Sequence, residues 1–297
     1  MGGLGDVLLK QRPADSVTIV FLLLLVSLAV ICYPAIPKAP SLIALYSILT
    51  VVQIVLIRFR NNSNFMGILY AIVFPILCVL LVFDSLGRLV HYINPGDIDP
   101  LLIRIDYTFF HNHPTVMLEK IMNPLLTDIL QLAYTSYYLI PITFCIILFK
   151  KGMEKEFDRS VFLILFCFYL SYVGYILFPA LGPRFYLSHI QTSELRGFLI
   201  AEPIQNILNS LEGIKRDAFP SGHTAITVLV LFLAYRYNKV YFWIALPVVS
   251  ALIFATVYCR YHYVVDVVAG FALMFLSLVL GEKYYAWWSK KTKNYLT

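Results

Sequence analysis

Long apolar blocks separated by short polar segments run along the chain from near residue 16 to residue 287. The apolar residues are continuous rather than spaced at amphipathic intervals, and most blocks approach the ~20 residues that a helix needs to cross the hydrocarbon core of a bilayer. No alternating ten-residue pattern of a membrane barrel appears, and backbone groups in lipid must be satisfied internally, so we predict helices. The predicted spans cover residues 16–36, 41–59, 66–90, 128–149, 160–180, 221–237, 241–258 and 263–287.

The composition agrees with this interpretation. Of 297 residues, 60% are hydrophobic and 13% are charged, whereas a soluble domain carries about 25% charged residues. The first block follows Lys10 and Arg12 and in this respect resembles a signal peptide. Its apolar run is long and further spans follow at once, so we expect a retained helix. The sequence therefore predicts an all-α integral membrane protein with about eight transmembrane helices.

The distribution of basic residues predicts the orientation of the chain. With both termini in the cytoplasm, the cytoplasmic segments would hold 14 of the 23 Lys and Arg residues, which the positive-inside rule favours. The connections that follow the fifth and seventh spans then lie on the opposite face, which is periplasmic, extracellular or lumenal. In a membrane protein the net charge of +6 does not indicate nucleic-acid binding.

Two long connections are expected on that outer face. Residues 91–127 mix charged, histidine and large apolar residues, which suits a short helix lying in the membrane interface. In this segment His111 and His113 are only two residues apart and no cysteine supports them, so we predict no metal site. The second connection is residues 181–220, in which the helical spacing of apolar residues over 203–213 predicts an amphipathic cap.

The string Phe219-Pro220-Ser221-Gly222-His223-Thr224 opens the sixth predicted span. The start of a helix has unpaired amides and a partial positive charge, and both favour a phosphate. Gly222 would let the backbone approach closely, Ser221 would add a hydroxyl, and His223 would stand at the membrane edge. The alternative is an ordinary capped helix with an interfacial histidine, but a string of this kind is improbable by chance.

A second motif opens the eighth predicted span and places His262 and Asp266 four residues apart, on one helix face. A carboxylate beside a histidine fixes the ring tautomer and raises its basicity. Arg184 lies at the outer end of the fifth span, where a guanidinium could bind phosphate oxygens in a fork, and Arg216 and Arg260 are further candidates. Both motifs fall on the same face, so together they predict a site for phosphoryl chemistry.

These residues resemble the signature of the type 2 phosphatidic acid phosphatase (PAP2) superfamily, whose fold also occurs in vanadium haloperoxidases. The resemblance covers roughly residues 130–280. It implies that spans three to eight form a six-helix core within residues 66–297, preceded by two helices in residues 1–65. The segment 99–138 is more loosely similar to the branch that contains fungal inositol phosphorylceramide synthases.

The resemblance also implies a role for each motif residue. His262 resembles the nucleophile that becomes phospho-histidine, Asp266 resembles its orienting carboxylate, and His223 resembles the acid that protonates the leaving alcohol. Three further residues match the phosphate-binding positions of the family, namely Arg184, Ser221 and Gly222. The family uses neither a metal nor another cofactor for this chemistry, and its substrates are lipid phosphates.

Two positions depart from the phosphatase pattern. A lysine of the family is replaced by Leu177 and an arginine by Thr256, and Arg260 could supply the missing charge. Two functions therefore stay open: a membrane lipid phosphate hydrolase with water as acceptor, and a lipid phosphotransferase that passes the phospho-head group to an alcohol such as inositol, ceramide or a sugar-bearing lipid. A transporter or flippase is a third alternative, although no broken helices in paired repeats are apparent.

Overall fold

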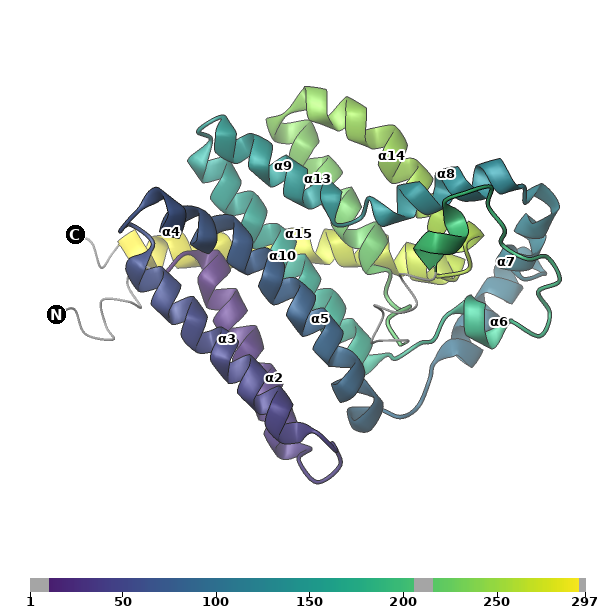
Figure 1. Cartoon of the computed structure of the whole chain (residues 1–297), viewed down its shortest axis with the longest axis horizontal. Helices are drawn as coiled ribbons and strands as arrows, with labels where there is room; N and C mark the ends of the chain where they lie inside the picture. Colours follow the sequence, from purple (N-terminus) through teal and green to yellow (C-terminus); the bar gives the residue numbers. More distant parts are fainter. Residues whose placement is uncertain (1–10, 206–215, 294–297) are drawn as a thin grey trace.

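The computed structural model of the chain describes residues 11–205 and 216–293. These residues form helices joined by loops, and within these ranges a parallel bridge between Ala180 and Asp217 is the one β interaction. The predicted all-helical architecture is confirmed (Figure 1). In chain order the helices are α2 (Pro13–Ile31), α3 (Ala39–Phe59), α4 (Asn64–Ile68), η1 (Leu69–Val73), α5 (Phe74–Ile93), α6 (Asp99–Phe110), α7 (Pro114–Met117), η2 (Leu118–Ile121), α8 (Pro124–Thr135), α9 (Leu139–Lys150), α10 (Glu154–Leu177), α11 (Pro183–Tyr186), α13 (Gly222–Tyr237), α14 (Lys239–Tyr258) and α15 (Val264–Lys293).

Within the described ranges, six helical stretches are long and apolar enough to cross a membrane: α2, α3, the continuous stretch α4–η1–α5, α10, α14 and α15. The pair α8 and α9 makes a seventh candidate that is bent by 49°. Pro141 explains where this pair breaks, because it has no N–H to bond the carbonyl of Tyr137. The predicted span 128–149 is therefore interrupted. The predicted span 221–237 corresponds to α13, which has only 16 residues, so the count of eight is not reached by length and composition.

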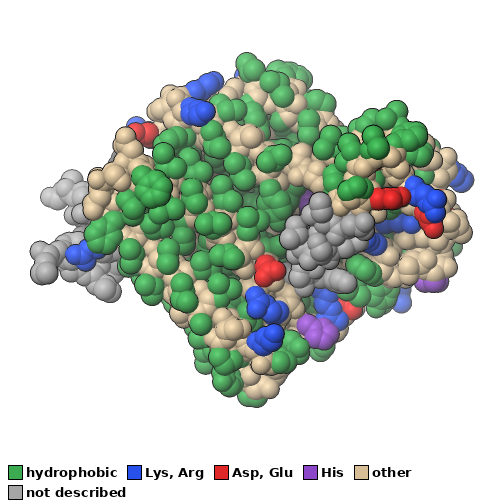
Figure 2. All heavy atoms as spheres, viewed as in Figure 1, with side chains coloured by type: hydrophobic (Ala, Val, Ile, Leu, Met, Phe, Trp, Pro, Cys, Tyr) green, Lys and Arg blue, Asp and Glu red, His purple; other side chains and the backbone are tan. Residues whose placement is uncertain are grey.

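The helix α10 lies at the centre of the bundle. In its most apolar window 72% of the residues are buried, against 33–44% in the other five spans, because α10 packs against α2, α5, α9, α13 and α15. The other spans keep large apolar side chains on the outside. Figure 2 shows hydrophobic side chains over much of one face, whereas charged side chains gather in its lower centre and towards the right-hand end. This surface is what contact with lipid requires.

Polar contacts tie the first two helices to the rest of the bundle. Nη1 of Arg12 lies 2.7 Å from Oδ1 of Asp158 on α10. The buried carboxylate of Asp15 on α2 accepts hydrogen bonds from Nε2 of Gln53 on α3, at 2.7 Å, and from the hydroxyl of Tyr70 in η1. A buried charge must be paired and hydrogen-bonded to be tolerated, and these contacts connect the start of α2 with α3, η1 and α10.

The connection 91–127 contains α6, α7 and η2, which lie beyond one end of the bundle, on the right in Figure 1. The helix α6 is amphipathic, as predicted for an interfacial element. Leu101 and Phe109 are exposed on it, whereas Leu102 and two aspartates are buried. The predicted cap at 203–213 falls mostly outside the described residues.

Candidate active site

The first motif forms the start of α13. Ser221 is the N-cap residue, and its Oγ accepts a hydrogen bond from the backbone N–H of Thr224 at 3.3 Å. The N–H of Ser221 donates to the carbonyl of Asp266 at 3.1 Å, which joins the start of α13 to the start of α15. Ser221 is fully buried. The N-cap expected from the sequence is present, and its hydroxyl is occupied in capping the helix.

The second motif lies in the loop between α14 and α15. The N–H groups of Tyr261 and His262 both donate to the carbonyl of Thr256 at 2.9 Å, which folds this loop back onto the end of α14. Arg260 adopts a left-handed conformation with φ of 64°, which is uncommon for a residue with a side chain. The loop thereby turns sharply enough to bring His262 over α13.

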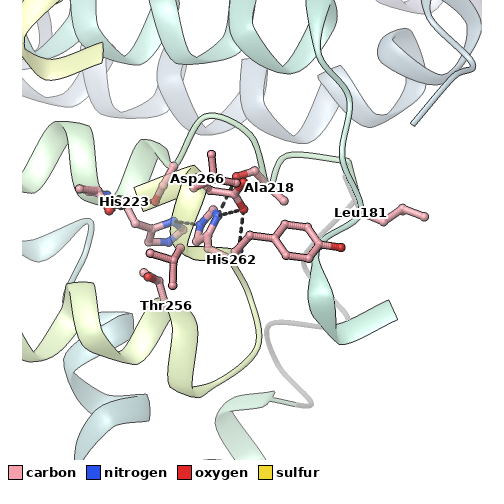
Figure 3. Close-up of polar contacts among 12 residues, drawn as sticks. Leu181, Ala218, His223, Thr256, His262 and Asp266 are labelled. Atoms are coloured by element: carbon pink, nitrogen blue, oxygen red, sulfur yellow. Dashed lines mark hydrogen bonds and ion pairs between the residues drawn. The ribbon is translucent and has the colours of Figure 1, made fainter. Parts of the chain in front are cut away.

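The two histidines and Asp266 lie together, as Figure 3 shows. Nδ1 of His262 is 2.7 Å from the carbonyl oxygen of Ala218 and 3.4 Å from Oδ2 of Asp266. Both neighbours are acceptors, so Nδ1 carries the proton and Nε2 keeps its lone pair. Nε2 faces Nδ1 of His223 at 3.5 Å. The geometry therefore leaves the unprotonated nitrogen of His262 pointing at the second histidine.

Asp266 is held in place by the backbone. Its Oδ2 accepts a hydrogen bond from the N–H of Tyr263 at 2.8 Å, while Oδ1 is buried with no hydrogen-bond partner in the part of the chain that the structure describes. Sequence spacing predicted the His262–Asp266 pair. It did not predict the carbonyl of Ala218, which comes from a distant loop and is the closer acceptor.

Arg184 and Arg260 contact each other through the backbone. The N–H of Arg184 donates to the carbonyl of Arg260 at 2.9 Å. Nη2 of Arg260 is bound by Oε1 of Glu119 and by the carbonyl of Ser193, each at 2.7 Å. Nη1 of Arg184 and Nε of Arg260 are buried and lack a hydrogen-bond partner within residues 11–205 and 216–293. Two cationic donors are therefore available to an anion.

A polar cavity of about 710 Å³ adjoins these two arginines. Its wall comes mostly from the connection between α10 and α13 and includes Gln191, Thr192 and Glu202. Arg216 makes different contacts. Its guanidinium pairs with Asp97 at 2.9 Å and donates to two backbone carbonyls of the 94–97 segment, so the structure does not group it with the pair at the cavity.

Two buried aspartates of α6, to which the sequence assigned no role, bind the segments around the site. Asp99 accepts hydrogen bonds from the N–H groups of Leu181 and Gly182, both at 2.8 Å. Asp106, two turns further along α6, accepts from the N–H groups of Val264 and Val265 at 2.8 and 2.9 Å. Burial raises the pKa of both carboxyl groups, and these backbone hydrogen bonds oppose the shift. The helix α6 therefore binds both the loop that follows α10 and the start of α15.

Asp217 is a further carboxylate beside the histidines. Its backbone bridges Ala180, and the next residue supplies the carbonyl that binds His262. Burial raises the pKa of Asp217 to about 6, and a positive charge on His262 would act in the opposite direction. Asp217 therefore lies within electrostatic reach of His262.

A multispan helical bundle with a His–His–Asp site at one end defines a class of membrane phosphotransfer protein. The model of the PAP2 superfamily matches residues 100–280, which is more than half of the chain. The chain belongs to the PAP2 superfamily.

Two curated relatives are similar to parts of the chain. A PA-phosphatase related-family protein of Dictyostelium discoideum is 25% identical over 186 residues, covering 56% of this chain and 34% of that protein. The phosphoinositol dihydroceramide synthase of Bacteroides thetaiotaomicron is 27% identical over 172 residues, covering 50% of this chain and 53% of that protein. The chain thus spans about a third and about half of the lengths of these relatives. No solved structure matches the chain.

Proposed function

We propose that the protein is a membrane lipid phosphate hydrolase that works through phospho-His262. The observation that carries this proposal is the set of contacts made by the ring of His262. Its Nδ1 contacts the carbonyl of Ala218 and the carboxylate of Asp266, while its Nε2 faces His223. That arrangement suits a nucleophile with an orienting carboxylate and an adjacent acid. Membership of the PAP2 superfamily supports a lipid phosphate as substrate.

In the first step, the lone pair on Nε2 of His262 attacks phosphorus and the bond from phosphorus to the lipid oxygen breaks. His223 donates a proton to that oxygen, so the lipid leaves as a neutral alcohol. In the second step, His223 takes a proton from water, the oxygen of water bonds to phosphorus, and the N–P bond breaks. The 3.5 Å contact between the histidines is too short to hold a phosphoryl group, so substrate entry must separate the two rings.

We further propose that Arg184 and Arg260 bind the phosphate oxygens. Their unpartnered donors Nη1 and Nε support this role, because a charge-assisted hydrogen bond to phosphate would satisfy each of them. Gly222 and the start of α13 would complete the binding site with backbone N–H groups. Arg260 would then supply a positive charge that Thr256 cannot provide, because the threonine hydroxyl is neutral.

A phosphotransferase is the second candidate, and the polar cavity beside Arg184 and Arg260 favours it. The acceptor of a hydrolase is water, which needs little room. The cavity of about 710 Å³ could instead admit an alcohol acceptor or a large head group. In that case the alcohol replaces water in the second step, with His223 again taking the proton. The name of the Bacteroides relative supports the same alternative.

We also propose a topology of eight spans, with α13 and the bent pair α8–α9 each crossing the membrane. In this topology the helices within residues 1–65 precede a core at 66–297, both termini are cytoplasmic, and the site opens on the outer face. The positive-inside distribution of Lys and Arg supports it.

The test is to incubate the purified protein with labelled phosphatidic acid and phosphatidylinositol, with and without alcohol acceptors. We expect an acid-labile phospho-enzyme in the wild type, and no turnover above background in His262→Ala or Asp266→Asn. His189→Ala, at an exposed histidine of the outer connection, is the matched control and should remain active. Free phosphate as product identifies a hydrolase, and a new phospholipid identifies a transferase. Wild-type activity in His262→Ala would contradict the mechanism.

A further inference from the structure

Two tyrosines pack on the imidazole of His223: Tyr134 in the last turn of α8 (Pro124–Thr135) and Tyr137 in the turn between α8 and α9. The ring centroid of Tyr134 lies 4.4 Å from that of His223, with 22° between the planes. The ring centroid of Tyr137 lies 4.1 Å away, with 34° between the planes. At these distances the phenol rings make face contacts with the imidazole rather than edge contacts. The proposed acid of the site therefore has aromatic neighbours from one short segment of chain.

The same tyrosines are fixed by their own surroundings. Tyr134 stacks on Tyr261, the residue before His262, with centroids 4.2 Å apart and 18° between the planes. Tyr137 packs on Phe168 of α10 at 5.9 Å, and both tyrosines are almost completely buried. The aromatic contacts thus run from the loop of the nucleophile, through His223, to the central helix. A side chain packed in this way has little freedom to rotate.

This packing bears on the charge of His223 as well as on its orientation. In the first step His223 must carry a proton, but a site poor in water disfavours the charged imidazolium. The face of an aromatic ring attracts a cation within about 6 Å of its centroid, typically by ~0.5–2 kcal/mol. Two such faces lie within that distance of His223.

We propose that Tyr134 and Tyr137 are positioning residues for the proton donor. They hold the imidazole of His223 with Nδ1 toward His262, and they stabilise the protonated ring that gives its proton to the leaving alcohol. This inference rests on the proposed function, because it assigns a task to His223. It adds two residues that act through the histidine and not on the substrate.

The test compares leucine and phenylalanine at each position, on two lipid phosphates that differ in the leaving group. One is an alkyl ester, whose alkoxide needs a proton. The other is a nitrophenyl ester, whose phenolate leaves unprotonated. Tyr134→Leu and Tyr137→Leu should each lower kcat on the alkyl ester by about 3- to 30-fold, the rate equivalent of one lost cation–π contact. Both should stay within about 2-fold of wild type on the nitrophenyl ester.

Tyr134→Phe and Tyr137→Phe keep the aromatic face and should restore most of the activity on the alkyl ester. Tyr169→Leu is the matched control. Tyr169 is buried and stacks on Phe21 at 4.5 Å, so it reports the cost of losing a stacked ring that does not contact His223. Tyr169→Leu should change kcat by the same factor on the two esters. Activity on the nitrophenyl ester also shows that each variant folds.

Two results would overturn the inference and leave the phospho-histidine mechanism intact. One is an equal loss of kcat on the two esters, and the other is a phenylalanine variant as impaired as the leucine variant. A wild-type enzyme that turns over both esters without forming phospho-His262 would overturn the proposed function, and the inference with it. The two failures are therefore distinguishable in one set of assays.

Discussion

Gly222 is the residue on which the geometry of the first motif depends most directly. A Cβ at this position would collide with the hydroxyl of Tyr175 on α10, and it would lie 3.5 Å from both the hydroxyl of Tyr137 and Oγ of Ser171. The start of α13 is thus pressed against two buried tyrosines. Glycine is required here for close packing between helices, in addition to any approach of the backbone to phosphate.

Gly222→Ala should displace the start of α13 and with it His223. We expect a loss of stability of about 1–3 kcal/mol, which is usual for an extra carbon in a packed interior, and a fall in kcat. Tyr175→Phe removes the oxygen that the new Cβ would meet, so the double variant should recover part of both losses. Thermal unfolding in detergent and turnover of a lipid phosphate measure the two effects. A Gly222→Ala protein as stable and active as wild type would refute this account of the packing.

The catalytic candidates could be predicted because their spacing is local. His262 and Asp266 are four residues apart, on either side of the start of α15, and Ser221 precedes a helix start, so short segments define both features. The carbonyl of Ala218 and the ring of Tyr134 could not be predicted in this way. They reach the histidines only through the folding of distant segments, 44 residues away in the case of Ala218.

The helix α6 has only 12 residues but binds two segments of the site through hydrogen bonds. Of its two buried aspartates, Asp99 binds a loop that lies 82 residues further along the chain, and Asp106 binds the start of α15, 158 residues further along. The sequence predicted an interfacial helix in this region from its mixture of charged and apolar residues. It could not predict that the acidic side chains face inward, because that depends on which loops pack beneath the helix.

Asp106→Ala should loosen the start of α15, where His262 and Asp266 lie. Loss of a carboxylate that caps a helix start costs about 1 kcal/mol, and we expect kcat to fall because the two catalytic candidates shift. Asp106→Asn keeps one acceptor oxygen and should be affected less. Asp84→Ala is the control, because Asp84 forms an exposed pair with Arg88 at 3.5 Å, and such pairs contribute little. Equal effects at positions 84 and 106 would show that α6 does not brace the site.

At the scale of the whole molecule, the apolar pattern predicted most of the bundle but not its interruptions. Runs of apolar residues are a direct requirement of the bilayer, so α2, α3, α10, α14 and α15 all lie within or close to predicted spans. The break before α9 and the short α13 depend on Pro141 and on packing around the site. An element buried in a bundle need not satisfy the length rule that lipid imposes on an exposed one.

The proposed orientation makes a prediction about access from the two sides of the membrane. Phe185 is exposed beside Arg184, just past the end of α10, and Lys151 is exposed just before the start of that helix. Because α10 has 24 residues, it separates the two positions by ~36 Å, which is enough to cross a bilayer. They therefore report opposite faces.

In sealed vesicles with the outer face exposed, a membrane-impermeant maleimide should label Phe185→Cys at once and Lys151→Cys only after detergent is added. The unmodified protein, which has five cysteines of its own, gives the background to subtract. Labelling of Lys151→Cys alone in intact vesicles would reverse the orientation and place the histidines on the cytoplasmic face. The substrate would then have to come from the inner leaflet, while the chemistry at His262 would be unchanged.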